Sequence, residues 1–157
     1  MNAEELRGVA RRWMQEDPDP ETRAELEALL AGGDEAALAD RFGSALAFGT
    51  AGLRGVMGAG PNRMNRAVVL RTTAALARYL KATVEGAAQR GVVVGYDGRR
   101  GSRTFSEDVA RALAGEGVRA RVFGRDVPTP LVAFAVKRLG AAAMTRKKTS
   151  SRCLRLL

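Results

Sequence analysis

The chain has 157 residues, of which 46% are hydrophobic and 27% are charged, and this composition is typical of a globular domain. No apolar run approaches the roughly 20 residues that a membrane-spanning helix needs, and the N-terminus is too acidic and polar for a secretory signal. The absence of histidine excludes every His-based triad, and the single cysteine, Cys153, excludes an internal disulfide. We therefore expect a one-domain cytoplasmic protein with no membrane partner.

The net charge of +9 is concentrated at one end of the sequence. Residues 144–157, MTRKKTSSRCLRLL, contain five basic residues and no acidic residue. Elsewhere arginine is interleaved with Glu and Asp, a pattern typical of solvated helix faces. The segment has no aromatic residue that could stack on bases, so a nucleic-acid partner is not favoured. Two interpretations stay open: an arm that binds a polyanion non-specifically, or a segment that stands where another element belongs.

Residues 1–42 are predicted to form short helices. Asp19 before Pro20 predicts the N-cap and first residue of one helix, and Asp34 after two glycines predicts the cap of the next. Before them, apolar residues recur at spacings of three and four: Leu6, Val9, Ala10, Trp13 and Met14. We assign residues 1–42 to an N-terminal helical extension.

Residues 46–65, LAFGTAGLRGVMGAGPNRMN, are rich in glycine and lack a helical period, which predicts a strand followed by a loop. The glycines would let backbone amides approach an anion closely, and Arg54 could bind phosphate through two hydrogen bonds. The spacing matches neither a Walker loop nor the Rossmann fingerprint. The segment is therefore either a phosphate-binding loop or an ordinary glycine-rich turn.

A helix is predicted from Arg66 to about Val84. The β-branched run at 92–94 then predicts a strand covered on both faces. The next helix is predicted to begin near Ser102 or Thr104, and Thr104 with Glu107 fits a capping box. The apolar stripe of the first of these helices is expected to hold Val69, Thr72, Thr73, Leu76, Tyr79, Leu80 and Thr83.

The same alternation continues toward the C-terminus. Residues 118–124 alternate as a strand, and Pro130 lies near the start of another helix. A further strand is expected right after Gly140, although Ala141-Ala142-Ala143 is a poor start for one. The order strand–helix–strand–helix predicts an α/β layered domain with right-handed crossovers.

The segment GYDGRRGS, residues 95–102, follows the end of the predicted buried strand, where α/β folds commonly bind ligands. Asp97 and Arg99 could contact a ligand there, or they could pair with each other and brace the loop. A single carboxylate provides neither an acid/base pair nor a magnesium site. The residues therefore predict no metal site in this chain.

Three separated segments occur in an order that resembles a known family: RFGSALAFGTAGLRGVMGAGPNRMN, GVVVGYDGRRGS and VPTPLVAFAVKRLGAAA. They closely resemble the first domain of the phosphoglucomutase/phosphomannomutase superfamily, in its phosphoglucomutase/phosphopentomutase branch, over roughly residues 13–143. The resemblance implies a three-layer α/β/α domain with a mixed sheet, over residues 43–143, preceded by the N-terminal helices. It also implies that residues 144–157 form a basic tail outside the family pattern.

Members of that family move a phosphoryl group between two positions of a sugar phosphate, through a phosphoserine on a loop of domain 1. A magnesium ion bound by an Asp-rich loop of domain 2 assists. Arg54 matches the arginine of the GTAGLR motif, which implies that it contacts the phosphoryl group, with Thr50 and Gly52 in the same phosphate loop. Asp97 and Arg99 match a segment of the family that supports this site. The resemblance implies that they stabilise the structure around it and do not contact the phosphoryl group.

The resemblance stops after Ala143, where the family continues with a strand and a Thr-Ala-Ser-His-Asn-Pro-type loop. Ser150 and Ser151 do not match that loop, so the nucleophilic serine is absent. We expect a fragment of a mutase acting on hexose or pentose phosphates, such as glucose 1-phosphate, that is inactive alone. The alternatives are a non-catalytic binding or regulatory module whose basic tail binds a polyanion, and a piece that docks onto separately encoded downstream domains.

The same departure predicts a weakened fold. Loss of the strand expected after Gly140 would leave a neighbouring strand with an unpaired edge, and loss of further domains would expose surface that is normally covered. We therefore expect a marginal, aggregation-prone protein.

Overall fold

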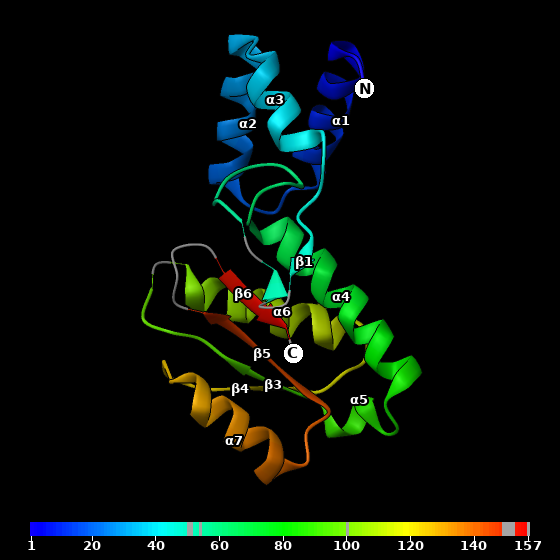
Figure 1. The fold of residues 1–157 in the computed structure, drawn as a ribbon, viewed down its shortest axis with the longest axis vertical. Helices are drawn as coiled ribbons and strands as arrows, with labels where there is room; N and C mark the ends of the chain where they lie inside the picture. Colours follow the sequence, from blue (N-terminus) through cyan, green and yellow to red (C-terminus); the bar gives the residue numbers. More distant parts are fainter. Residues whose placement is uncertain (50–51, 54, 100, 149–152, 157) are drawn as a thin grey trace.

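Three helices begin the chain: α1 (Ala3–Glu16), α2 (Pro20–Gly32) and α3 (Glu35–Phe42) (Figure 1). The computed structural model describes residues 1–49, 52–53, 55–99, 101–148 and 153–156. The predicted caps are confirmed, since Asp19 accepts a hydrogen bond from the Glu21 amide and Asp34 accepts one from the Ala37 amide. The short helices predicted within residues 1–42 are therefore present.

The N-terminal helices share a hydrophobic core with the rest of the molecule. Trp13 of α1 meets Phe42 of α3 edge to face, with ring centroids 6.2 Å apart, and the guanidinium of Arg71 lies 4.3 Å from the Trp13 ring centroid. Arg71 belongs to α4 (Arg66–Thr83), so this contact joins the helical extension to the α/β part. Leu26 and Leu38 are fully buried in the same cluster as strand residues Val92 and Val94.

A four-stranded mixed sheet forms the centre of the α/β part, in the order β4-β3-β5-β6. The strands are β3 (Val92–Gly95), β4 (Ala120–Val122), β5 (Ala143–Lys148) and β6 (Cys153–Leu156). β3 pairs in parallel with β4 and with β5, whereas β5 and β6 are antiparallel. The short helix α5 (Ala87–Arg90) precedes β3.

Helices cover both faces of this sheet (Figure 1). α4 and α6 (Ser102–Gly115) lie on one face and α7 (Thr129–Leu139) lies on the other. Alternate residues of β3 follow this division, because Val92 and Val94 join the core beneath α6 whereas Val93 joins the core beneath α7. The predicted three-layer α/β/α fold with a mixed sheet is thus confirmed.

The expectation that the strand after Gly140 is lost is wrong. β5 pairs with β3 in the register Val92↔Ala143 to Gly95↔Arg146, and β6 then pairs with β5. The physical reason is that ladder hydrogen bonds use backbone groups, so an open edge of β3 can be satisfied by a segment with little apolar character. The small or apolar side chains of Ala143 and Met144 are buried on its two faces. The expected unpaired edge of β3 is therefore absent.

Strand β5 spans the predicted boundary between residue 143 and the basic tail. The boundaries at 42 and 143 remain predictions, while residues 144–148 have a place in the fold. Among the described residues, no helix is both long enough and apolar enough to cross a membrane.

Two local predictions are corrected. Of the two starts predicted for α6, Ser102 is confirmed and the Thr104–Glu107 capping box is wrong. The residue before Ser102 is Gly101, whose φ of 76° is left-handed and suits glycine. In α4 the predicted stripe is displaced, since Tyr79 is 64% exposed while Ala77 is fully buried. The stripe that faces the core instead holds Val69, Thr73, Ala77 and Leu80.

Candidate functional site

The glycine-rich segment begins as a small hairpin. β1 (Phe48–Gly49) pairs antiparallel with β2 (Gly52–Leu53), so the predicted Gly52 lies opposite Gly49. Thr50 and Arg54 lie outside the described residues. Leu53, which precedes Arg54, is buried in the main core, and this anchors the end of β2.

The loop after Gly55 is closed by its own backbone and by Asn65. The Met64 amide donates to the Val56 carbonyl at 2.8 Å, and the Asn65 side-chain amide donates to the carbonyls of Gly58 and Gly60, both at 2.8 Å. The side-chain oxygen of Asn65 accepts from the Val68 amide and caps α4. We did not single out Asn65 from the sequence, although its place just before a predicted helix was the available signal.

Asp97 organises the loop that follows β3. Its side chain is buried, its Oδ1 accepts a hydrogen bond from the Arg99 amide at 3.3 Å, and its own amide donates to the Ser102 hydroxyl at 3.2 Å. Within the described part of the chain, the buried Oδ2 of Asp97 has no hydrogen-bond partner. Asp97 therefore braces the loop through backbone amides, and the roles predicted for Asp97 and Arg99 behind a phosphoryl site remain predictions.

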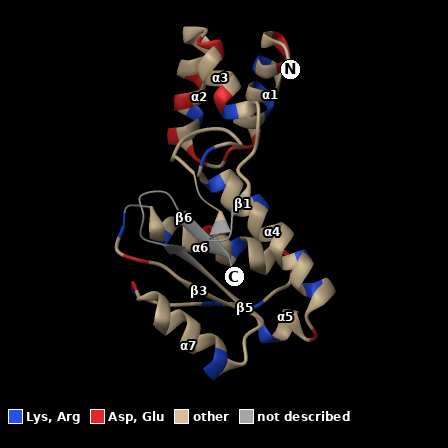
Figure 2. Cartoon of the chain, viewed as in Figure 1, with Lys and Arg blue, Asp and Glu red and all other residues tan. Residues whose placement is uncertain are grey.

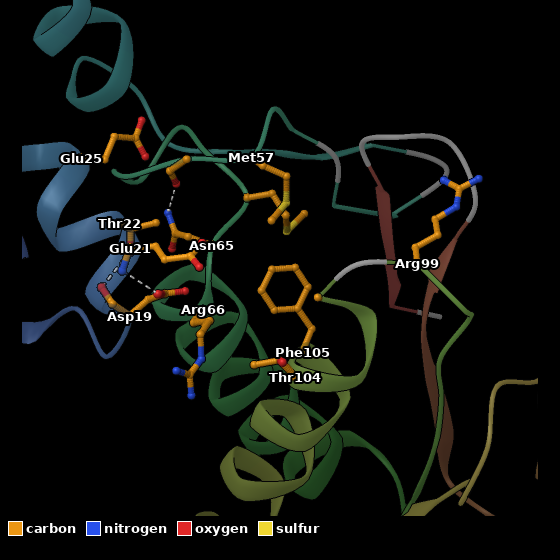
Figure 3. A pocket seen from close by; sticks show the side chains of 13 residues that line it. Asp19, Glu21, Thr22, Glu25, Met57, Asn65, Arg66, Arg99, Thr104 and Phe105 are labelled. Atoms are coloured by element: carbon orange, nitrogen blue, oxygen red, sulfur yellow. Dashed lines mark hydrogen bonds between the residues drawn. The ribbon is translucent and has the colours of Figure 1, made fainter.

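These two loops border a cleft of about 900 Å³, together with α2 and the starts of α4 and α6. Figure 3 shows Asp19, Glu21 and Glu25 on one side of the cleft and Arg99 on the other, with Phe105 between them. Arg99 is the predicted site residue that the described structure places in the cleft wall. The full lining is Asp19, Glu21, Thr22, Glu25, Met57, Gly58, Met64, Asn65, Arg66, Arg99, Gly101, Thr104 and Phe105.

Arg66 lines the cleft and is held by a carboxylate beneath it. Its Nε and Nη2 donate to the two oxygens of Asp108 at 2.7 and 2.9 Å, and the Asp108 side chain is only 1% exposed. Arg111 donates to the same carboxylate at 3.0 Å. The hydrogen bond to Asp108 raises the pKa of the Arg66 guanidinium above its usual value, so the side chain stays charged.

The described residues that line the cleft do not fit a resident magnesium ion. Among the described residues, no group of three or more His, Cys, Asp or Glu side chains is placed to hold a metal. The carboxylates near the cleft are also engaged, since Asp19 caps α2 and Glu25 pairs with Arg41. In Figure 2 acidic positions, coloured red, recur on α1 to α3, whereas basic positions, coloured blue, occur on α5 and at the end of α7, which do not line the cleft.

Replacing Gly60 by alanine should test how tightly the loop is packed. We expect Gly60→Ala to lower the free energy of unfolding by about 1–3 kcal/mol. The φ of Gly60 is +103°, and a Cβ there would lie 3.0 Å from the carbonyl oxygen of Arg41. Urea denaturation measures the change, with Gly32→Ala as the control. Gly32 lies in α2 with open space around it, so alanine should be neutral or stabilising there; equal losses in both variants would contradict the expectation.

One family model and several curated proteins match this chain. A family model described as phosphoglucomutase/phosphomannomutase, alpha/beta/alpha domain I, matches residues 45–145. A probable phosphoribomutase of Schizosaccharomyces pombe is 41% identical over 138 residues, covering 88% of this chain and 24% of the relative. A phosphopentomutase of Mus musculus and a glucose 1,6-bisphosphate synthase of Homo sapiens are each 38% identical over 138 residues, covering 84% of this chain and 22% of the relative.

The chain thus spans about a quarter of the length of these curated relatives. The comparison with solved structures gives no match. The matched residues include both loops that border the cleft, together with β3 and the first three residues of β5.

Proposed function

The chain belongs to the phosphoglucomutase/phosphomannomutase family, and from that premise we propose that it provides domain I of a phosphosugar mutase. The reaction would be intramolecular phosphotransfer on a hexose or pentose phosphate, such as the interconversion of glucose 1-phosphate and glucose 6-phosphate. The observation that supports this most strongly is the match over residues 45–145, which includes both loops that meet at the cleft.

In this proposal the chain's own residues bind and orient the phosphoryl group. Arg54 neutralises charge on the phosphoryl oxygens, and Thr50 and Gly52 belong to the same loop. Asp97 and Arg99 support the site from the loop after β3. Phosphoryl transfer depends mainly on positioning and on stabilising the developing charge, and a guanidinium beside glycine amides is suited to both tasks.

The 157-residue chain alone is proposed to be inactive. It contains no histidine, and Ser150 and Ser151 do not match the serine loop that the family resemblance implies. Magnesium would assist the transfer in a complete mutase, but the described residues of this chain do not fit it. The metal and the sugar would therefore be bound by other domains, onto which this chain would dock.

Phosphotransfer and sugar-phosphate binding can be tested separately, and we expect the chain to bind without turnover. With glucose 1-phosphate, magnesium and a bisphosphate activator, the purified chain should give no turnover above a protein-free control. Calorimetry should still detect weak binding of the sugar phosphate, and Arg54→Ala should abolish it. Arg23→Ala is the control, because it removes the same charge from an exposed position on α2. Turnover would refute the inactivity, and unchanged binding by Arg54→Ala would refute the role of Arg54.

A second candidate function is a non-catalytic module that binds a polyanion through residues 144–157. The five basic residues of this segment support it. Deleting the segment is a poor test, because residues 144–148 lie in β5. Replacing Lys147, Lys148 and Arg152 by glutamine should instead weaken heparin binding and flatten its salt dependence. Unchanged binding by the triple variant would rule this function out.

A further inference from the structure

The N-terminal helices contact the loop that follows Arg54 through a charged pair. The Glu25 Oε2 of α2 accepts a hydrogen bond from the Ala59 amide at 2.9 Å. The Oε1 of the same carboxylate lies 2.7 Å from Nη1 of Arg41 on α3, and that nitrogen donates to the Ala59 carbonyl at 3.4 Å. Both the N–H and the C=O of Ala59 are therefore bound by side chains of the helical extension.

The last turn of α3 adds a second set of contacts to the same loop. The Asn62 amide donates to the Arg41 carbonyl at 3.1 Å, and its side chain donates to the Asp40 carbonyl at 2.8 Å. Arg63 forms an ion pair with the Asp40 carboxylate. Helices α2 and α3 thus hold the loop along most of residues 58–63.

The backbone conformation of the loop favours glycine at position 58, and the side chains of the helices approach it closely. A Cβ at Gly58 would lie 3.0 Å from the Arg41 guanidinium and 3.1 Å from the Glu25 carboxylate, and its φ of +149° lies in the region that favours glycine. Glycine backbones have wide conformational freedom, so such a loop keeps one conformation only when other groups hold it. Glu25 and Arg41 meet this requirement for Gly58 and its neighbours.

We propose that Glu25 is a positioning residue, through which α2 and α3 fix the backbone of the loop that borders the phosphoryl-binding cleft. The inference rests on the proposed function, because the loop directly follows Arg54 and contributes Met57 and Gly58 to the cleft wall. The helical extension then contributes to binding at the cleft, because it holds this loop in position. Loss of the carboxylate should free the loop and weaken phosphate binding without unfolding the sheet.

Amide hydrogen exchange of the full chain tests the positioning role directly. In Glu25→Ala, the Ala59 amide should exchange about tenfold faster, as expected for the loss of a hydrogen bond to a charged acceptor. The amides of Val93 and Val94 in β3 should keep their protection. Glu25→Gln should give an intermediate result, because its side-chain oxygen can still accept from Ala59 while the charge that pairs with Arg41 is lost. Glu27→Gln, at an exposed position of the same helix, is the matched control.

Two exchange results would overturn the proposal. Unchanged protection of Ala59 would show that Glu25 does not hold the loop. A uniform loss that included β3 would show that Glu25 acts on global stability instead. If Glu25→Ala fails to fold, Glu25→Gln decides the matter by the same two criteria.

Binding of inorganic phosphate, followed by ³¹P NMR, tests the consequence for the site. Glu25→Ala should bind severalfold more weakly than the wild type, and Glu27→Gln should bind equally well. Wild-type affinity in Glu25→Ala would overturn the link between loop position and binding. If the wild type binds no phosphate, the proposed function of the cleft fails, and the exchange results alone decide whether Glu25 holds the loop.

Discussion

Asp108→Ala should lower the free energy of unfolding by about 3 kcal/mol, because it removes the buried member of a charged cluster. The Asp108 carboxylate receives two hydrogen bonds from Arg66 and one from Arg111, and its side chain is 1% exposed. Without it, the Arg66 guanidinium at the start of α4 loses its partner in α6. The value lies at the lower end of the range for broken buried pairs, since the Arg66 side chain is 21% exposed and can be partly hydrated.

Guanidinium denaturation at neutral pH gives this change from the shift in midpoint and slope. Glu107→Ala is the matched control on the same helix. Its carboxylate pairs with Arg103 at 3.2 Å but is 46% exposed, so its removal should change stability by less than about 0.5 kcal/mol. Equal losses in the two variants would show that burial of Asp108 contributes nothing beyond a surface ion pair.

The second large effect is expected at Trp13. Trp13→Ala should lower the free energy of unfolding by about 3–5 kcal/mol, because it removes the contacts of the indole ring with Phe42 of α3 and with Arg71 of α4. Trp13→Phe should lose less than half as much. It keeps an aromatic ring in the core, and it removes the indole N–H, which is buried with no hydrogen-bond partner among the described residues.

The same experiment tests whether the two parts of the chain unfold together. Because they share one core, wild type and both variants should each unfold in a single transition by circular dichroism. A separate transition of the helices in the wild type would contradict this. Tyr79→Ala serves as the control, since this exposed residue of α4 should change stability by less than about 0.5 kcal/mol.

The elements that could be predicted from the sequence are those with local signals. Asp19 and Asp34 identified helix starts, and the run Val92–Val94 identified the buried strand, because capping and burial on two faces each select residue types at fixed positions. α6 was placed correctly, but its cap was not. The N-cap of α6 is Gly101 in the αL conformation, whereas the capping box would have placed the N-cap at Thr104.

The features that could not be predicted depend on partners far apart in the sequence. A strand right after Gly140 was expected from the alternation of strands and helices, but its retention was not, because the pairing of β5 follows from the open edge of β3 and no property of residues 143–148 indicates it. The roles of Glu25 and Arg41 were missed because each residue looks like part of a solvated helix face. Their contact with Ala59, 34 residues beyond Glu25, exists only once α2 and the loop are packed together. The role of Arg54 still rests on the family resemblance.

The contact between Glu25, Arg41 and the loop also determines which sequence changes the chain can accept together. A side chain at Gly58 would displace the charged ends of Glu25 and Arg41 from their present positions, unless a smaller residue stood at position 25 or 41. A change at Glu25 would in turn leave the Ala59 amide to find another acceptor. Substitutions at these sites should therefore be non-additive, and related sequences that differ at one should differ at the others. If a related sequence supplied residues 58–63 without α2 and α3, or the two helices without the loop, surfaces that are not complementary would be brought into contact.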